Sequence, residues 1–269
     1  MRNWRLIQDA PADGAGNMAS DEAILRAVEK GAVAPTLRLY EWDRPAISIG
    51  YTQDPARFIH RAQGCGVPVV RRITGGRAVM HHMEMTYSVV CVVSHPLFSA
   101  GIGGAYSILS GCILNALRDI GIEAALSPGR RRGATLRESC FHAPARHEIL
   151  VNGRKLVGSA QRRFKNAFLQ HGSILMDVDK GLFARVFDGA AIGEIGWVRD
   201  FSTAGKEELA AAFVRRMEEG LGVEFIEDTL SGGEVYLKGV IAERRYSRGE
   251  WNLNGDDGDM ESRISAVNI

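Results

Sequence analysis

Short runs of apolar and β-branched residues dominate the first hundred positions, after one segment with helical periodicity. Residues 17–30 place Ile24, Leu25 and Val28 on one helical face, with acids in the first turn, and Gly31 follows. This pattern predicts a helix capped at its first residue and ended by that glycine. The later runs favour strands that share one sheet. They are TLRLYEW from Thr36, AISIGY from Ala46, PVVRRIT from Pro68 and MTYSVVCVV from Met85.

Apolar positions at helical spacing predict three more helices. The first spans 105–120 and presents one apolar stripe to the sheet, while 206–220, closed by its last glycine, and 234–246 are amphipathic. Beyond the last helix the chain becomes polar and rich in Gly and Asp. We therefore expect a single domain over residues 1–250 and a polar, frayed tail over 251–269.

The remaining strands cluster in the middle of the chain. Residues 148–163 are typical of a β-hairpin because Asn152-Gly153 separates two strand-like runs, and 167–178 supplies another strand. Strands come first, a helix follows, strands return and helices end the chain. This order predicts an α+β fold rather than a regular βαβ alternation.

Composition and charge exclude several function classes. The 269 residues are 45% hydrophobic, and 33 Lys and Arg balance 32 Asp and Glu to a net charge of +1. This balance lacks the positive bias of non-specific nucleic-acid binding. No stretch approaches the roughly 20 apolar residues of a membrane span, and no signal peptide is recognisable. We expect a cytoplasmic protein with neither nucleic acid nor membrane as a partner.

One cysteine has surroundings that favour reactivity. The four cysteines are Cys65, Cys91, Cys112 and Cys140. They lack CxxC spacing, and the seven histidines form no HExxH motif, so we expect neither disulfides nor a metal or other cofactor. Cys140 follows a basic loop at 127–139 and precedes His142 and His147, and nearby cations favour the nucleophilic thiolate. The other three lie in an apolar strand, on a helix stripe or in a turn without basic neighbours.

Two glycine-containing segments are candidates for ligand contact. Residues 71–82, RRITGGRAVMHH, contain the pair Gly75-Gly76, which permits a close backbone approach to a ligand, flanked by arginine donors. A tight hairpin with solvated arginines is the alternative. Residues 153–163, GRKLVGSAQRR, present Lys155, which could stabilise negative charge on a carbonyl oxygen or be an ordinary surface lysine.

Together and in this order, the segments resemble the biotin/lipoate A/B protein ligase family from about Trp4 to Tyr246. That family has a helix similar to NMASDEAIL, then RR-[IT]-[ST]-G-G-x-A-V-x-H, K-x-x-G-S-A and H-G-[ST]-[IL]. All four motifs are present, at residues 17–25, 71–81, 155–160 and 171–174. The resemblance implies a fold like that of class II synthetases and biotin protein ligases, a mainly antiparallel mixed sheet flanked by helices.

The resemblance also implies which residues form the site. A slot for a medium-length acyl chain is expected between the glycine pair and Lys155. The implied acyl-binding residues are Arg72, Thr74, Gly75, Gly76, Arg77, Ala78 and His81. Those implied near the reactive carbonyl are Lys155, Gly158, Ser159 and Ala160, and His171 completes the substrate-binding set.

Within the family, the chain is most similar to cysteine-dependent octanoyltransferases that act on the glycine cleavage H protein. The matching stretches are 138–141 (ESCF), 153–162 (GRKLVGSAQR) and 169–174 (LQHGSI). The similarity implies transfer of octanoate from octanoyl acyl-carrier protein to a lysine of a lipoyl-domain protein. Cys140 would form the thioester, with Lys155 as the second catalytic group and no cofactor.

Two other functions stay open from sequence. The chain could be an ATP-dependent lipoate-protein ligase that works through an acyl-adenylate, although MHHMEMTYS departs from the HDxGNxN pattern of many ligases. It could also be a non-catalytic module that binds an acylated partner. The loop arginines Arg130, Arg131, Arg132 and Arg137 offer a surface for acidic carrier proteins, or are simply solvated.

Overall fold

An eight-stranded mixed sheet forms the centre of the molecule in the computed structural model, which describes residues 3–127, 148–187 and 189–258. Its strand order is β11-β1-β2-β6-β10-β9-β8-β7. The bounds are β1 (Asn3–Gln8), β2 (Thr36–Tyr40), β6 (Glu84–Val92), β7 (Ala125–Leu126), β8 (Ile149–Val151), β9 (Arg154–Arg163), β10 (Ala167–Leu175) and β11 (Glu224–Asp228). β1 runs parallel to β2 and β11, and the other neighbours are antiparallel. The predicted α+β class with a mainly antiparallel sheet is confirmed.

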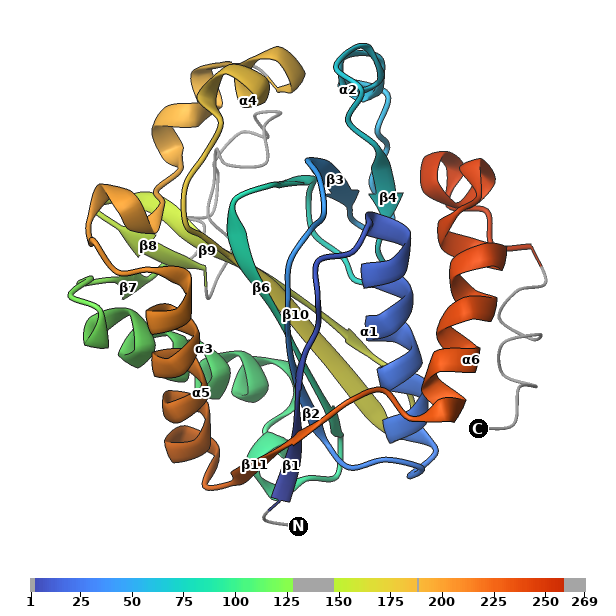
Figure 1. Ribbon diagram of the computed structural model, residues 1–269, viewed down its shortest axis with the longest axis vertical. Helices are drawn as coiled ribbons and strands as arrows, with labels where there is room; N and C mark the ends of the chain where they lie inside the picture. Colours follow the sequence, from blue (N-terminus) through green and yellow to red (C-terminus); the bar gives the residue numbers. More distant parts are fainter. Residues whose placement is uncertain (1–2, 128–147, 188, 259–269) are drawn as a thin grey trace.

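A separate three-stranded sheet lies at one end of the large one, at the top of Figure 1. Its strands are β3 (Ala46–Ile49), β4 (Val69–Arg71) and β5 (Val79–His81), in the order β4-β3-β5. The prediction of one common sheet was therefore wrong for these strands. Because β3 pairs with both β4 and β5, those two are not adjacent, and a tight hairpin at the glycine pair is wrong as well.

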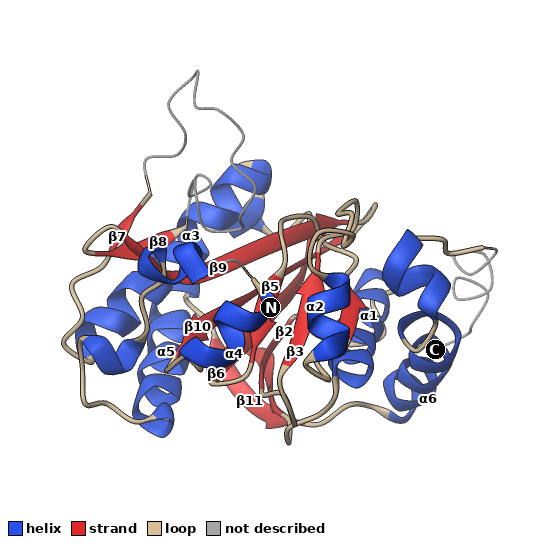
Figure 2. Cartoon of the chain, turned by 90° about the horizontal axis from the view of Figure 1, so that it is seen from above, coloured by secondary structure: helices blue, strands red, loops and turns tan. Residues whose placement is uncertain are grey.

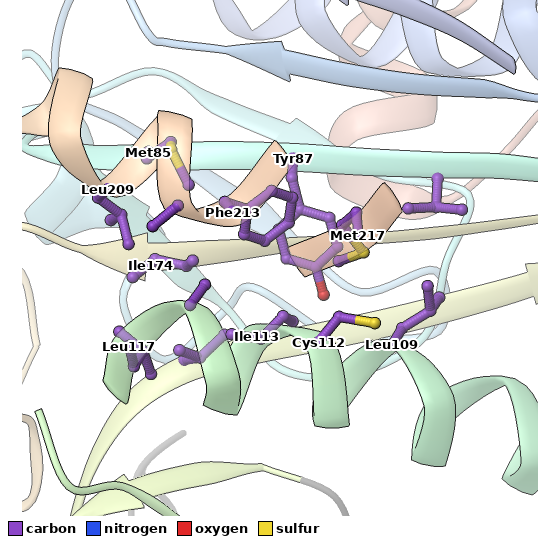
Figure 3. Close-up of a cluster of buried hydrophobic side chains, with 14 of the residues drawn as sticks. Met85, Tyr87, Leu109, Cys112, Ile113, Leu117, Ile174, Leu209, Phe213 and Met217 are labelled. Atoms are coloured by element: carbon purple, nitrogen blue, oxygen red, sulfur yellow. The ribbon is translucent and has the colours of Figure 1, made fainter. Parts of the chain in front are cut away.

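Two helical layers enclose the large sheet (Figures 1 and 2). One face is covered by α1 (Gly14–Glu29) and α6 (Gly232–Ile241), and the other by α3 (Gly101–Asp119) and α5 (Lys206–Leu221). Figure 3 shows side chains of α3 and α5 meeting Met85 and Tyr87 of β6 and Ile174 of β10. Each such side chain, when fully buried, contributes about 1.5–3 kcal/mol to folding.

Short elements complete the chain. The small sheet packs with α2 (Ile59–Gly64) and α4 (Lys180–Val186) in a third apolar cluster. Short 3₁₀ helices form at η1 (Pro96–Phe98), η2 (Gly189–Glu194) and η3 (Val198–Asp200), and short π-helices form at η4 (Ala242–Tyr246) and η5 (Glu250–Asn254). No helix among the described residues is long and apolar enough to cross a membrane.

Several helix boundaries differ from their predicted positions, and two of the differences have a clear physical reason. Helix α1 begins at Gly14, because the Asp13 carboxylate accepts a hydrogen bond from the backbone of Gly16 at 2.7 Å and caps the helix one turn early. Helix α5 continues through Gly220 and ends at Gly222, which adopts a left-handed conformation with φ of 62°. Gly220 has a packing role instead, since a Cβ atom there would lie 2.4 Å from Sγ of Cys112 on α3.

The chain stays ordered and packed beyond position 250, where fraying was expected. Trp251 is buried, and its indole donates to the Arg71 carbonyl oxygen at 2.8 Å. Arg245 forms an ion pair with Asp257 at 2.6 Å. An aromatic anchor within a polar stretch therefore ties this segment to β4. Residues 259–269 lie outside the described part, so the expectation for them stays a prediction.

Candidate active site

A cavity of about 330 Å³ opens between the small sheet and strands β9 and β10 of the large sheet. This volume is at the lower end of the roughly 300–1,000 Å³ of ordinary small-ligand pockets. Its wall is mostly apolar, with contributions from Met80, Leu156 and Phe183, and a few polar groups converge on it. Among the described residues, no cluster of His, Cys, Asp or Glu could hold a metal ion.

The structure gathers nearly all of the predicted and described site residues around this cavity. The residues that line it are Arg72, Gly76, Arg77, Ala78, His81, Lys155, Gly158, Ser159, Ala160 and His171. Thr74 and Gly75 do not line it, and each is hydrogen-bonded to Arg72. Gly76 has a φ of 97°, and its carbonyl oxygen would lie 2.0 Å from a Cβ atom at Gly50. Glycine is therefore needed at both Gly76 and Gly50 for the backbone path of the glycine loop.

One buried series of hydrogen bonds runs from α1 to the glycine loop. Nδ1 of His171 donates to Oδ2 of Asp21 at 2.9 Å, which leaves Nε2 to accept from the Thr74 hydroxyl at 2.7 Å. The Thr74 oxygen accepts in turn from Nε of Arg72 at 3.1 Å. Because the Asp21 carboxylate can only accept, it fixes the tautomer of His171.

A second series has the same chemical order. Nδ1 of His81 donates to the Glu84 carboxylate, and its Nε2 is hydrogen-bonded to the Ser48 hydroxyl at 2.7 Å. The Ser48 oxygen accepts from a terminal nitrogen of Arg72 at 3.1 Å. The indole of Trp42 stacks on the His81 ring, with centroids 3.8 Å apart and planes at 10°.

Both series end at Arg72, which organises the loop. Besides the two hydroxyl oxygens, its guanidinium donates to the carbonyl oxygens of Ser48, Gly75 and Arg77 at 2.8–2.9 Å. Arg72 is only 5% exposed, so these five bonds are sheltered from water. The side chain thus holds the loop in shape, and a direct contact with the acyl group stays a prediction.

Burial sets the charge states in the first series. It lowers the pKa of His171 despite the favourable Asp21 carboxylate, which keeps the ring neutral. Burial alone would raise the pKa of Asp21, but the hydrogen bond from His171 and the charge of Arg38 outweigh it and lower that pKa. Arg38 donates to Asp21 at 2.8 Å, so the buried carboxylate is ionised and paired.

Lys155 lies on the predicted Asn-Gly hairpin, whose position the structure confirms. Asn152 and Gly153 have φ of 49° and 77°, as a two-residue turn of this type requires. The Lys155 ammonium forms an ion pair with Glu148, the residue just before β8. Its backbone carbonyl accepts from Gly196 at 2.9 Å, which fixes the start of β9.

A tyrosine pair supports the β9 wall beside Lys155. The hydroxyls of Tyr87 and Ser159 are 2.7 Å apart, and Tyr106 donates to the Ser159 carbonyl oxygen at 3.3 Å. Burial raises the pKa of both tyrosines, so they act here as neutral hydrogen-bonding groups. Gly172 on β10 leaves the room for this packing, since a Cβ atom there would lie 2.7 Å from the Ser159 hydroxyl.

The described cysteines do not supply a nucleophile to the cavity. Burial raises the pKa of Cys91 to about 12 and that of Cys112 to about 11, so both thiols stay protonated. Cys65 lies at the end of α2, and none of the three lines the cavity. Cys140 lies outside the described residues, as do His142, His147 and the loop arginines Arg130, Arg131, Arg132 and Arg137.

Sequence reasoning did not single out five side chains of the site: Asp21, Trp42, Ser48, Glu84 and Glu148. Two of them left a signal. Asp21 lies inside a helix of which nearly every residue is buried, and Glu84 stands between two methionines at the start of an apolar strand. An acid in either position needs a buried partner. Which partner it has depends on the tertiary fold.

Comparisons with known proteins agree on one family. The sequence model of the lipoyl protein ligase A/B catalytic domain matches residues 13–204. The chain is 38% identical to octanoyltransferase LipM of Carboxydothermus hydrogenoformans over 266 residues, which cover 93% of this chain and 98% of the relative. It is also 38% identical to octanoyltransferase LipM of Halalkalibacterium halodurans over 276 residues, with 94% and 99% covered.

Solved structures give the same result for the fold. The putative lipoate protein ligase Ta0514 of T. acidophilum, with bound lipoic acid, superposes with a TM-score of 0.80 at 26% identity. The match covers 94% of this chain and 99% of that protein. A lipoate-protein ligase A bound with ATP gives 0.81 at 26% identity, with 93% and 98% covered.

Proposed function

The chain belongs to the lipoyl protein ligase A/B catalytic-domain family, and on this premise we propose that it transfers octanoyl groups through a thioester on Cys140. It is an octanoyltransferase of lipoate biosynthesis, the activity that relatives 36–38% identical over nearly their whole length carry in their names. The observation that supports the catalytic proposal best is the position of Lys155. Its side chain lines the same cavity as Gly76 of the glycine loop and the neutral His171.

The partners are an acyl donor and a lipoyl-domain acceptor. In the proposed reaction the donor is octanoyl acyl-carrier protein, and the acceptor is a lysine of a lipoyl-domain protein such as the glycine cleavage H protein. The apolar cavity wall suits the hydrocarbon chain, because burial of each CH₂ group contributes about 0.8 kcal/mol. No nucleotide is required, since the thioester is already activated.

The reaction proceeds in two steps. The Cys140 thiolate attacks the octanoyl carbonyl carbon, and the resulting oxyanion collapses to release the carrier thiolate. The acceptor amine then attacks the thioester on Cys140 and takes the octanoyl group. The Lys155 ammonium stabilises the oxyanion in both steps, which is the kind of charge stabilisation that lowers acyl-transfer barriers most.

Intact-protein mass spectrometry tests the covalent step. Mixed with octanoyl acyl-carrier protein and no nucleotide, the protein should gain the mass of one octanoyl group and lose it when a lipoyl domain is added. Cys140→Ser should abolish both signals and slow the transfer by several orders of magnitude. Lys155→Ala should slow the transfer by about 10²–10³-fold.

Cys65→Ser is the matched thiol control and should keep the full activity, because Cys65 does not line the cavity. If Cys140→Ser still modified the acceptor, with free octanoate and ATP as the source, the protein would be a ligase. Absence of acyl transfer under either condition would favour a binding module.

A further inference from the structure

Glu148 and Lys155 form an ion pair at the edge of the cavity. The carboxylate contacts the ammonium directly, and both side chains line the cavity. They are 14% and 15% exposed, so water screens the pair only in part. A carboxylate in this position determines where the ammonium points.

The local backbone brings the two residues together. Glu148 immediately precedes β8, and Lys155 is the second residue of β9, where it pairs with Leu150. A register shift at Ile149 and Leu150 changes the spacing of the two strands at this point. Gly158 leaves the path of the lysine open, because a Cβ atom there would lie 3.0 Å from its Cε and 3.2 Å from its Nζ.

The other described acids that line the cavity are engaged elsewhere. Glu84 accepts from His81 and from the backbone nitrogen of His82. Asp177 accepts from Arg199 at 2.8 Å. Asp179 caps α4 through a hydrogen bond at 2.8 Å. Glu148 is thus the described acid of the cavity that contacts Lys155.

We propose that Glu148 is a positioning residue that holds the Lys155 ammonium across Gly158 and so directs it to the oxyanion. A carboxylate beside an amine favours its charged form, and an ammonium can stabilise an oxyanion but cannot remove a proton. The inference rests on the proposed function, because it specifies that Lys155 stabilises the oxyanion in that reaction and does not act as a general base.

The proton balance closes without Lys155 as a base. The acceptor lysine attacks in its neutral form, the C–N bond forms, and the amine nitrogen of the intermediate carries an extra proton. As the C–S bond breaks, Cys140 leaves as a thiolate and takes that proton. The products are an amide and the free thiol, while Lys155 keeps its charge throughout both steps.

Three variants at two carboxylates test this role. Glu148→Gln removes the charge, Glu148→Asp keeps it, and Asp200→Asn removes a comparable ion pair from the same hairpin, since Asp200 binds Arg154 at 2.7 Å outside the cavity. Glu148→Gln should reduce the rate of acyl-enzyme formation by about 10²-fold, mainly in kcat. Glu148→Asp should recover most of that loss, and Asp200→Asn should keep the wild-type rate.

A second measurement does not depend on transfer. An amine-selective reagent should label Lys155 several-fold faster in Glu148→Gln than in the wild type at one mildly alkaline pH, as quantified by peptide mass spectrometry. Equal labelling, or a rate loss that Glu148→Asp fails to recover, would overturn the proposal. If the wild type forms no acyl-enzyme but the labelling difference is present, the covalent mechanism fails while the positioning of Lys155 by Glu148 stands.

Discussion

At the scale of single residues, the site depends on two histidines whose rings are oriented by buried carboxylates. His171 and His81 each donate to an acid through Nδ1 and contact a hydroxyl through Nε2, and both hydroxyl oxygens accept from Arg72. A protonated ring could not accept that hydrogen bond. Protonation of His171, whose ring is kept neutral by burial, would therefore end its acceptance of the hydrogen bond from Thr74 beside the glycine loop.

This arrangement predicts that stability falls on mild acidification. Burial lowers the pKa of His171 below its ordinary value of 6.5, so below about pH 6.5 the unfolded chain binds a proton that the native protein does not. At about pH 5 the free energy of unfolding should be lower by up to about 2 kcal/mol. Asp21, whose pKa is also lowered, adds a loss of stability only at pH values below its ordinary 3.8.

Urea unfolding near neutral pH and near pH 5 would measure the loss. His171→Gln keeps a polar side chain but has no proton to gain, so its stability should depend less on pH. His60→Gln, on the exposed side of α2, is the control and should behave as the wild type. The same pH dependence in His171→Gln and the wild type would contradict the assignment.

At the scale of elements, local patterns were enough to predict most helices and strands. The β8–β9 hairpin falls where the Asn-Gly pair placed it, and α3 covers the predicted helix but begins one turn earlier, at Gly101. These predictions were possible because the signals lie in neighbouring residues. The separate small sheet was not predictable, since the partner of a short strand such as β3 is chosen by the tertiary fold. The motifs located the cavity wall, but they could not show that Asp21 meets His171, which is 150 positions away in the sequence.

Two glycine substitutions should have opposite effects on stability. At Gly172, an alanine Cβ would lie 2.6 Å from the Gly158 carbonyl oxygen and 2.8 Å from the Tyr87 ring. Gly172→Ala should therefore lower the free energy of unfolding by about 1–3 kcal/mol. Gly111 lies inside α3 with no atom within 4 Å of such a Cβ, so Gly111→Ala should raise it by about 0.5–1 kcal/mol.

Chemical denaturation of both variants would measure these changes, and the transfer rate gives a second readout. Gly172→Ala should also slow the reaction, because it displaces Ser159 from the β9 wall of the cavity. Gly111→Ala should leave the rate unchanged. If Gly172→Ala changed neither the free energy of unfolding nor the transfer rate, β9 and β10 would be able to separate at little cost in free energy.

At the scale of the whole molecule, the C-terminal segment at residues 250–258 stabilises the glycine loop on the side away from the cavity. Arg71, beside Arg72, directs its guanidinium away from the cavity to the carbonyl oxygens of Trp251 and Leu253, at 2.9 Å each. It also donates to the carbonyl oxygen of Tyr51 at 2.8 Å. The two adjacent arginines thus have different roles. Arg72 organises the glycine loop, and Arg71 joins the small sheet to the C-terminal segment.

Trp251→Ala should therefore weaken a region far from it in sequence. Loss of the buried indole should lower the free energy of unfolding by about 3–5 kcal/mol. Hydrogen exchange should rise at residues 69–81, because the hydrogen bond from the indole to the Arg71 carbonyl oxygen is lost with the ring. Tyr236→Ala, on the exposed face of α6 at 63% exposure, should change neither property. Faster exchange confined to residues 242–258 would show that the C-terminal segment and the small sheet are independent. Faster exchange that extends to β5 would show that the C-terminal segment stabilises the wall of the cavity.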